Sequence, residues 1–295
     1  MTDSLVYQLS TAAISTGSRI APFVAGRLAL RLFSTPFTAS TLSQRQKFLV
    51  GKADKRLAAM PALRIRHRAG EVQTYFFEAK PYVAPAGTII LVHGWTSGAR
   101  FMLAFVNALA RRGFNVVVFD LPAHGKSTGR VTNMSECAAA LQAVGDHYGP
   151  IHGIVAHSFG SAVTALAVEA ALPMTSKLDV AKIALIASPN AVSFATRSLG
   201  KVIGLGQRAQ DDFETQLAAQ VGRPIDSLTG TKIYTTIAKP LLVIHCEDDD
   251  EVPFAQGSQY MEVPSCQFVA VRGLGHRRIL YSWNVVRKVA QFMAE

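Results

Sequence analysis

Ser158 stands at the centre of the pentapeptide Ala-His-Ser-Phe-Gly, residues 156–160. The apolar run 151–156 comes before it and the helix-like run 161–171 comes after it, so the sequence predicts a strand, a sharp turn and a helix. A turn of this kind exposes the serine hydroxyl on a strained backbone, beside the first turn of the helix. Serine is a weak nucleophile unless a base takes its proton, so a histidine and a carboxylate are expected later in the chain.

Two later segments supply both partners. The strand-like run 241–245 is followed by five consecutive acidic residues, 247–251, and a carboxylate at the end of a strand can orient an imidazole. His276 follows the strand-like run 267–271 through a Gly-Leu-Gly turn, which lets the ring reach back over the sheet. The joint occurrence of the three residue types, each after a predicted strand, predicts nucleophilic catalysis by Ser158.

The order serine, aspartate, histidine is typical of the α/β-hydrolase superfamily. The chain resembles that superfamily from about Leu63 to the C-terminus. The family's acid often lies three residues after a glycine and three before the valine of Val-Pro. With Cys246 in the position of that glycine, the resemblance implies Asp249 as the acid, and Asp248 and Asp250 are the alternatives.

The resemblance also implies an oxyanion hole made by two backbone N–H groups, those of Trp95 and Phe159. Trp95 follows His93-Gly94 at the end of the apolar run 88–92, and Phe159 follows the serine. We expect His93 to hold its loop by a side-chain hydrogen bond rather than to act as a base.

Two further histidines lie near these segments. The resemblance implies a structural loop over residues 120–127, so His124 has no predicted catalytic role. His157 is expected to point away from the chemistry if the turn at Ser158 forms.

The implied fold class is α/β: a mostly parallel central sheet flanked by helices, with a helical cap inserted before the strand that carries the acid. The alternation of apolar runs with helical segments favours such a sheet independently. The cap covers about residues 190–238. Its apolar side chains can line an acyl pocket or be buried in an ordinary helix interface; the candidates are Phe194, Leu199, Ile203 and Phe213.

Residues 1–60 are predicted to form a basic, partly apolar helical N-terminal extension, and residues 61–295 are predicted to form the hydrolase domain. The net charge is +10, and residues 1–68 carry most of it, with eleven Lys/Arg and two acidic residues. A helix is predicted over Pro22–Phe33, because proline suits a first helical turn and Arg27 and Arg31 then share one face. Three interpretations stay open: packing on the hydrolase body or a second subunit, peripheral contact with a membrane interface, or a weakly ordered leader.

The chain has three cysteines, Cys137, Cys246 and Cys266. Because Cys246 and Cys266 lie in or beside predicted strands, we expect buried thiols rather than a disulfide, which suits a reducing cytoplasm. No signal peptide is expected, because Arg19 interrupts the first apolar stretch and no lysine or arginine precedes it. Histidines and cysteines lack metal-ligand spacing, so no metal site is predicted. The hydrolase chemistry that the resemblance implies needs no cofactor. Nucleic acid is not an expected partner, since no recognition motif accompanies the basic residues.

The predicted activity is hydrolysis of a carboxylic ester of a small-molecule acyl substrate through an acyl-enzyme. A thioesterase, lactonase, peptidase, C–C hydrolase or acyltransferase would use the same residues. The alternative outside enzymology is a non-catalytic member of the fold that binds a ligand or a partner.

Overall fold

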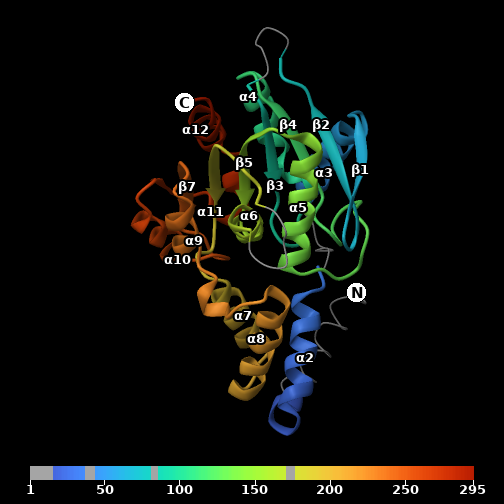
Figure 1. Ribbon diagram of the computed structural model, residues 1–295, viewed down its shortest axis with the longest axis vertical. Coiled ribbons are helices and arrows are strands. Elements are labelled where there is room, and N and C mark those ends of the chain that lie inside the picture. Colours follow the sequence, from blue (N-terminus) through green and yellow to red (C-terminus); the bar gives the residue numbers. More distant parts are fainter. Residues whose placement is uncertain (1–15, 37–43, 81–85, 171–176) are drawn as a thin grey trace. The chain divides into compact units, whose positions relative to one another are not determined.

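The structure is a computed structural model that describes residues 16–36, 44–80, 86–170 and 177–295 (Figure 1). The chain divides into two compact units. The helical unit combines the described part of Met1–Thr35 with Ala191–Thr229, and the sheet unit combines the described part of Pro36–Asn190 with Gly230–Glu295. The division of the chain near residue 60 stays a prediction.

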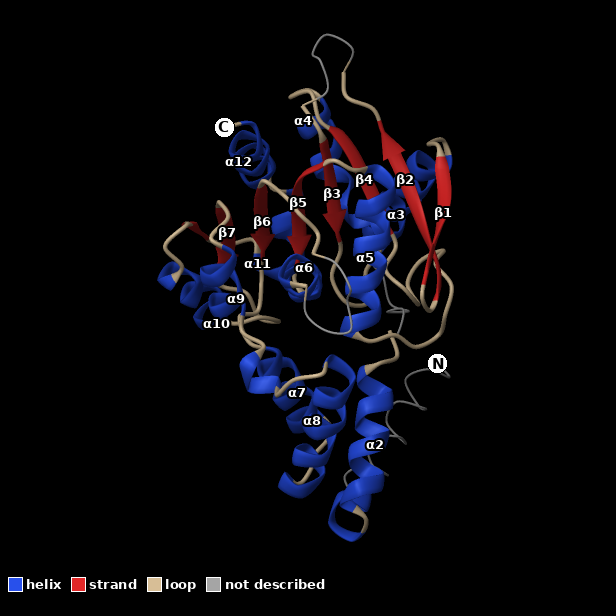
Figure 2. Ribbon diagram, viewed as in Figure 1, coloured by secondary structure: helices blue, strands red, loops and turns tan. Residues whose placement is uncertain are grey.

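The sheet unit is built on one eight-stranded sheet in the order β1-β2-β4-β3-β5-β6-β7-β8 (Figure 2). The hairpin β1-β2 pairs antiparallel, β2 pairs antiparallel with β4, and all other neighbours are parallel. The strands are β1 Ala62–His67, β2 Gly70–Phe77, β3 Thr88–Val92, β4 Asn115–Phe119, β5 Ile151–His157, β6 Lys182–Ile186, β7 Leu241–Cys246 and β8 Cys266–Val271.

The mostly parallel α/β sheet predicted from the apolar runs is confirmed. Strands β3, β5, β6 and β7 are buried along nearly their whole length, because helices cover both faces of the sheet. This explains why their sequences read as continuous apolar runs rather than as alternating ones.

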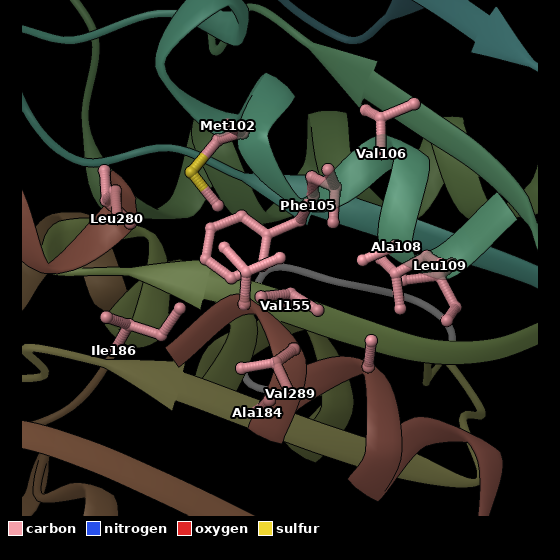
Figure 3. Close-up of a cluster of buried hydrophobic side chains, with 14 of the residues drawn as sticks. Met102, Phe105, Val106, Ala108, Leu109, Val155, Ala184, Ile186, Leu280 and Val289 are labelled. Carbon is pink, nitrogen blue, oxygen red and sulfur yellow. The ribbon is translucent and has the colours of Figure 1, made fainter. Parts of the chain in front are cut away.

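Helices of the sheet unit pack in two layers. On one face, α4 and α12 contact each other and cover a large apolar cluster in which Phe105, Val155 and Val289 meet (Figure 3). On the other face, α5 packs on α6, and α6 contacts β5 and β3. The helices are α3 Gln44–Ala58, α4 Leu103–Ala110, α5 Met134–Tyr148, α6 Phe159–Glu169, α9 Gly230–Ile237, α10 Phe254–Ser258, α11 Gly275–Arg278 and α12 Trp283–Ala294.

The helical unit contains α2 Pro22–Phe33, α7 Val192–Val202 and α8 Gln207–Val221. The helix predicted over Pro22–Phe33 is confirmed, with Pro22 at its first position as expected. The insertion between β6 and β7 is helical, as predicted for the segment before the acid-bearing strand. None of the helices that the structure describes is long and apolar enough to cross a membrane.

Helix α2 packs along α8, so the N-terminal segment and the insertion share one interface. Phe33 and Phe213 form an edge-to-face pair there, with ring centroids 5.4 Å apart. Phe213 is fully buried, so of the two roles predicted for this side chain the structure selects the helix interface. Sequence could not decide this, because the partner helix is more than 170 residues away in the chain.

The close approach of α2 to α8 depends on Gly26. A Cβ atom at this position would lie 2.9 Å from the Ala209 carbonyl oxygen and 3.0 Å from the Phe213 nitrogen, both backbone atoms that cannot easily give way. Gly51, in α3, is the matched case, because a Cβ there meets no atom within 4 Å.

We therefore expect Gly51→Ala to stabilise the protein by up to about 1 kcal/mol, the helix-propensity gain of alanine over glycine. Gly26→Ala should lower stability despite the same propensity gain, because α2 must move off α8. Thermal unfolding and amide exchange of α2 and α8 measure the two effects. Equal stabilisation by both substitutions would contradict the tight α2–α8 contact.

Candidate active site

Ser158 lies in a sharp turn between β5 and α6, as the sequence predicts. Its φ of 52° is a left-handed value that costs energy for a residue with a side chain. The turn is held because the Ser158 N–H donates to the Ile186 carbonyl of the neighbouring strand at 3.0 Å. Gly160 is required two residues later, since a Cβ there would lie 2.7 Å from the carbonyl oxygens of Val92 and His93.

The structure brings Ser158, His276 and Asp249 together in one hydrogen-bonded chain. The Nε2 atom of His276 lies 2.9 Å from the Ser158 Oγ, and its Nδ1 lies 2.8 Å from the Asp249 Oδ2. An ionised carboxylate only accepts hydrogen bonds, so Nδ1 carries the hydrogen and the Nε2 lone pair faces the serine hydroxyl. In this tautomer the imidazole can accept the serine proton.

Asp249 is held as an anion. Its Oδ1 accepts the N–H groups of Glu251 at 3.0 Å and Val252 at 2.8 Å, while Oδ2 faces His276. Burial alone would raise the pKa of this carboxyl, but the hydrogen bonds from His276 and the backbone outweigh burial and lower it.

Of the two acids next to Asp249, one has other partners and one is exposed. The Asp248 Oδ1 accepts the Gly273 N–H at 2.6 Å and the Cys246 thiol at 3.0 Å. Asp250 is exposed. Of the three acids that the sequence leaves open, only Asp249 contacts the imidazole of His276.

Cys246 fixes the turn that carries His276. Its buried sulfur accepts the N–H groups of Leu274 at 3.4 Å and Gly275 at 3.2 Å. The residue that stands where the family pattern has glycine thus anchors the His276 turn to the end of β7. The sequence shows the substitution but not this contact, because the contact joins the end of β7 to a turn 28 residues later.

The Trp95 loop lies against the serine turn. A Cβ on Gly94 would be 3.1 Å from the Ser158 Cβ, so the absence of a side chain allows this approach. The rings of Trp95 and Phe159, whose amides are the two predicted oxyanion donors, contact each other at 5.0 Å. Phe159 is the first residue of α6, a position whose N–H has no acceptor within the helix.

His93 holds the Trp95 loop, as predicted. Its Nε2 accepts the Leu121 N–H at 2.9 Å, so its Nδ1 carries the hydrogen and donates to the Gly94 carbonyl at 2.7 Å. Complete burial lowers the pKa of His93 well below its usual value, which keeps the ring neutral for this pair of bonds.

The loop after β4 is tied down by Asp120. Its carboxylate accepts the Ala99 N–H at 2.8 Å and the Lys126 N–H at 3.0 Å, and its carbonyl accepts the Ser127 hydroxyl. His124 belongs to this loop and donates from Nδ1 to the Pro122 carbonyl at 2.9 Å. It contacts neither Ser158 nor Asp249 by any hydrogen bond in the described chain.

The expectation that His157 points away from the chemistry is wrong. Its Nε2 donates to the backbone carbonyl of His276 at 2.9 Å, and the two rings lie 4.8 Å apart. Burial, and then the neighbouring His276, lower the pKa of His157 to about 3. A neutral His157 therefore helps to hold the backbone of His276 in place. The orientation of the His157 ring depends on how the Ser158 turn packs against the His276 loop. This packing cannot be read from the residues around His157.

A second buried histidine, His245, lies beside the acid. Its Nε2 donates to the Val252 carbonyl at 2.9 Å and is 3.5 Å from the Asp249 Oδ2. Burial lowers the pKa of His245, so this ring also stays neutral next to Asp249. Within residues 16–36, 44–80, 86–170 and 177–295, no group of three or more His, Cys, Asp or Glu side chains could hold a metal ion.

A sequence model described as the alpha/beta hydrolase family matches residues 89–288, about two thirds of the chain. Among curated proteins, "Uncharacterized protein YqkD" of Bacillus subtilis (strain 168) is 24% identical over 232 residues, which cover 74% of this chain and 75% of that protein.

Two solved structures share the fold at low identity. A thermophilic esterase from Thermogutta terrifontis, with malate bound, is 18% identical with a TM-score of 0.56, over 78% of this chain and 97% of the esterase. Est1E from Butyrivibrio proteoclasticus, with ferulic acid bound, is 17% identical with a TM-score of 0.62, over 79% and 96% of the two chains.

The burial of His157 makes stability depend on pH. Between pH 6.5 and about 3, the unfolded chain binds a proton at this ring that the folded chain excludes, so stability falls as the pH falls. We expect the loss of stability between pH 6 and 5 to be about 1 kcal/mol smaller in His157→Gln than in the wild type.

Urea unfolding at several pH values measures this difference. At pH 8 the histidine is neutral in both states, so the comparison there reports only the lost hydrogen bond and serves as the control. Equal pH slopes for the two proteins would contradict a buried, neutral His157.

Proposed function

The chain belongs to the alpha/beta hydrolase family, and from its site we propose that it hydrolyses carboxylic esters through an acyl-enzyme on Ser158. The observation that carries the proposal is the chain of hydrogen bonds from Asp249 through His276 to Ser158, at 2.8 and 2.9 Å. A nucleophile, a base and a group that orients the base are the parts that acyl transfer requires.

In the first step, the Ser158 Oγ attacks the ester carbonyl while the His276 Nε2 takes the hydroxyl proton. Asp249 keeps the proton of Nδ1 in place and stabilises the imidazolium that forms. The tetrahedral intermediate then expels the alcohol, to which His276 returns the proton. In the second step, His276 activates a water molecule that attacks the acyl group. The carboxylic acid product then leaves, and His276 returns the proton to Ser158.

Negative charge develops on the carbonyl oxygen in both steps. The N–H groups of Trp95 and Phe159 are the proposed donors to it. The contact between the two residues and the bonds of His93 to Gly94 and Leu121 support this assignment, because they fix the Trp95 loop beside α6. Loss of one such donor typically costs about 100- to 1000-fold in rate.

An ester is the preferred substrate class because a relative of the same fold, the one from Thermogutta terrifontis, is an esterase. Thioesters, lactones and amides react through the same groups. Turnover of matched p-nitrophenyl esters, thioesters, lactones and anilides separates these classes, and a chain without any turnover would be a binding protein.

The assignment of the three side chains is tested by substitution, with turnover of a p-nitrophenyl ester as the measurement. Ser158→Ala should reduce kcat to background, about a million-fold. Asp249→Asn should reduce kcat by about ten thousand-fold, because the amide favours the wrong tautomer of His276.

Asp250→Asn is the matched control, since its carboxylate is adjacent in sequence but exposed. It should stay within about twofold of the wild type, as expected for a surface substitution. A larger loss in Asp250→Asn than in Asp249→Asn would show that the acid is misassigned.

A further inference from the structure

Helix α2 of the helical unit carries an exposed apolar face. Ile20, Phe23, Val24 and Leu28 are 82, 61, 54 and 45% exposed. By their spacing of three and four residues, Phe23, Val24 and Leu28 lie on one side of α2, and Ile20 lies just before the helix. Arg27 and Arg31 share that side and are also exposed. We call these six residues the α2 face.

The opposite side of α2 already makes the contacts that the fold needs. Ala25, Gly26, Ala29 and Leu30 are buried, and the helix packs along α8. A surface helix that packs on one side normally carries polar residues on the other. The large apolar side chains of the α2 face therefore need an explanation outside this packing.

Positive charge predominates on the segments that carry and adjoin the α2 face, while the Asp212 carboxylate of α8 lies near Gly26 on the packed side of α2. Residues 16–36 and 191–210 contain no acidic residue. The bond from the Gly206 N–H to the Ser18 hydroxyl joins the turn between α7 and α8 to the segment before α2. Exposed cations lie on both segments: Arg19, Arg27, Arg31, Lys201 and Arg208.

The carboxylates that the structure describes in the helical unit are bonded to other partners. Asp211 accepts from Gln207, Asp212 from Gln216, Glu214 from Thr196, and Asp226 from Arg197. None of the five cations forms an ion pair with a carboxylate of the described chain. Val202, 68% exposed, adds a further apolar side chain beside Lys201.

We propose that the α2 face lies in the interface of an anionic lipid bilayer. Its apolar side chains would enter the boundary between headgroups and acyl chains, while the arginines extend to the lipid phosphates. At about 1.5 Å per residue, the twelve residues of α2 span about 18 Å, less than the hydrocarbon core, so the helix lies in the plane of the interface.

A second copy of the chain fits this face less well. A two-fold symmetric contact places the same patch on both subunits. Arg27 and Arg31 would then meet the arginines of the other copy without a carboxylate in the patch to pair with them. An anionic lipid surface instead supplies the opposite charge for every cation on the face.

The inference goes beyond the proposed function and does not depend on it, because binding requires neither Ser158 nor His276. The test is flotation of the full chain with vesicles of phosphatidylcholine alone and of phosphatidylcholine mixed with phosphatidylglycerol. We expect binding to the mixed vesicles, weaker binding to the neutral ones, and weakening by salt, since screening shortens the reach of charge to about 10 Å or less.

Two variants locate the binding surface. Phe23→Asp should reduce partitioning into the mixed vesicles by about tenfold or more. It removes a phenyl ring that would be buried in the bilayer, and it adds a negative charge that the anionic lipids repel. Met261→Asp is the matched control: Met261 is 60% exposed but lies in the sheet unit, and its substitution should leave binding unchanged.

Arg27→Gln combined with Arg31→Gln provides an independent test that keeps the apolar residues. It should weaken binding to the mixed vesicles more than to the neutral ones. Circular dichroism checks that each variant is folded.

Three results would overturn the proposal: no flotation of the wild type with the mixed vesicles, equal losses for Phe23→Asp and Met261→Asp, or a concentration-dependent dimer that Phe23→Asp dissociates while vesicles bind neither protein. Unchanged ester hydrolysis in Phe23→Asp would separate a failure of membrane binding from a failure of the active site.

Discussion

The meeting of Ser158 and His276 depends on the parallel arrangement of β3, β5, β6, β7 and β8. Parallel strands end at the same edge of a sheet, so residues that follow different strands converge although they are far apart in sequence. The serine follows β5, the acid follows β7, and the histidine follows β8. The strained backbone of the serine turn persists because the neighbouring elements hold it in place. The Ile186 carbonyl accepts the N–H of Ser158, and Gly160 lets α6 approach β3.

Around this edge, buried neutral histidines act as hydrogen-bonding parts of the scaffold. His93 holds the Trp95 loop, His157 holds the backbone of His276, and His245 borders Asp249. Each ring is buried enough to lower its pKa, so each donates from one nitrogen without adding a positive charge beside the imidazole that must accept a proton. The Cys246 sulfur likewise holds the His276 turn, because it accepts two backbone N–H groups of that turn.

Much of this arrangement could be predicted, because each of its sequence signals lies within one short segment. Continuous apolar runs mark strands buried on both faces, Pro22 marks the start of α2, and the turn at Ser158 follows from a strand, a serine and a glycine within ten residues. The acid could only be narrowed to three neighbours, since five consecutive acidic residues share one loop. Distances to His276 separate Asp249 from Asp248 and Asp250.

The parts that sequence did not reveal are contacts between distant segments. Phe213 packs on Phe33 of the N-terminal helix, and His157 bonds a backbone carbonyl 119 residues away. Neither partner can be found from spacing or composition, because tertiary packing alone brings them together.

The most direct test of the account is whether Ser158 is an activated nucleophile. Intact-mass analysis after treatment with a fluorophosphonate compares the wild type with Ser158→Ala. We expect one adduct on the wild type and none on the variant, since only a serine whose proton is taken by His276 reacts at neutral pH. An adduct on both proteins, or on neither, would contradict the central claim that this site performs acyl transfer through Ser158.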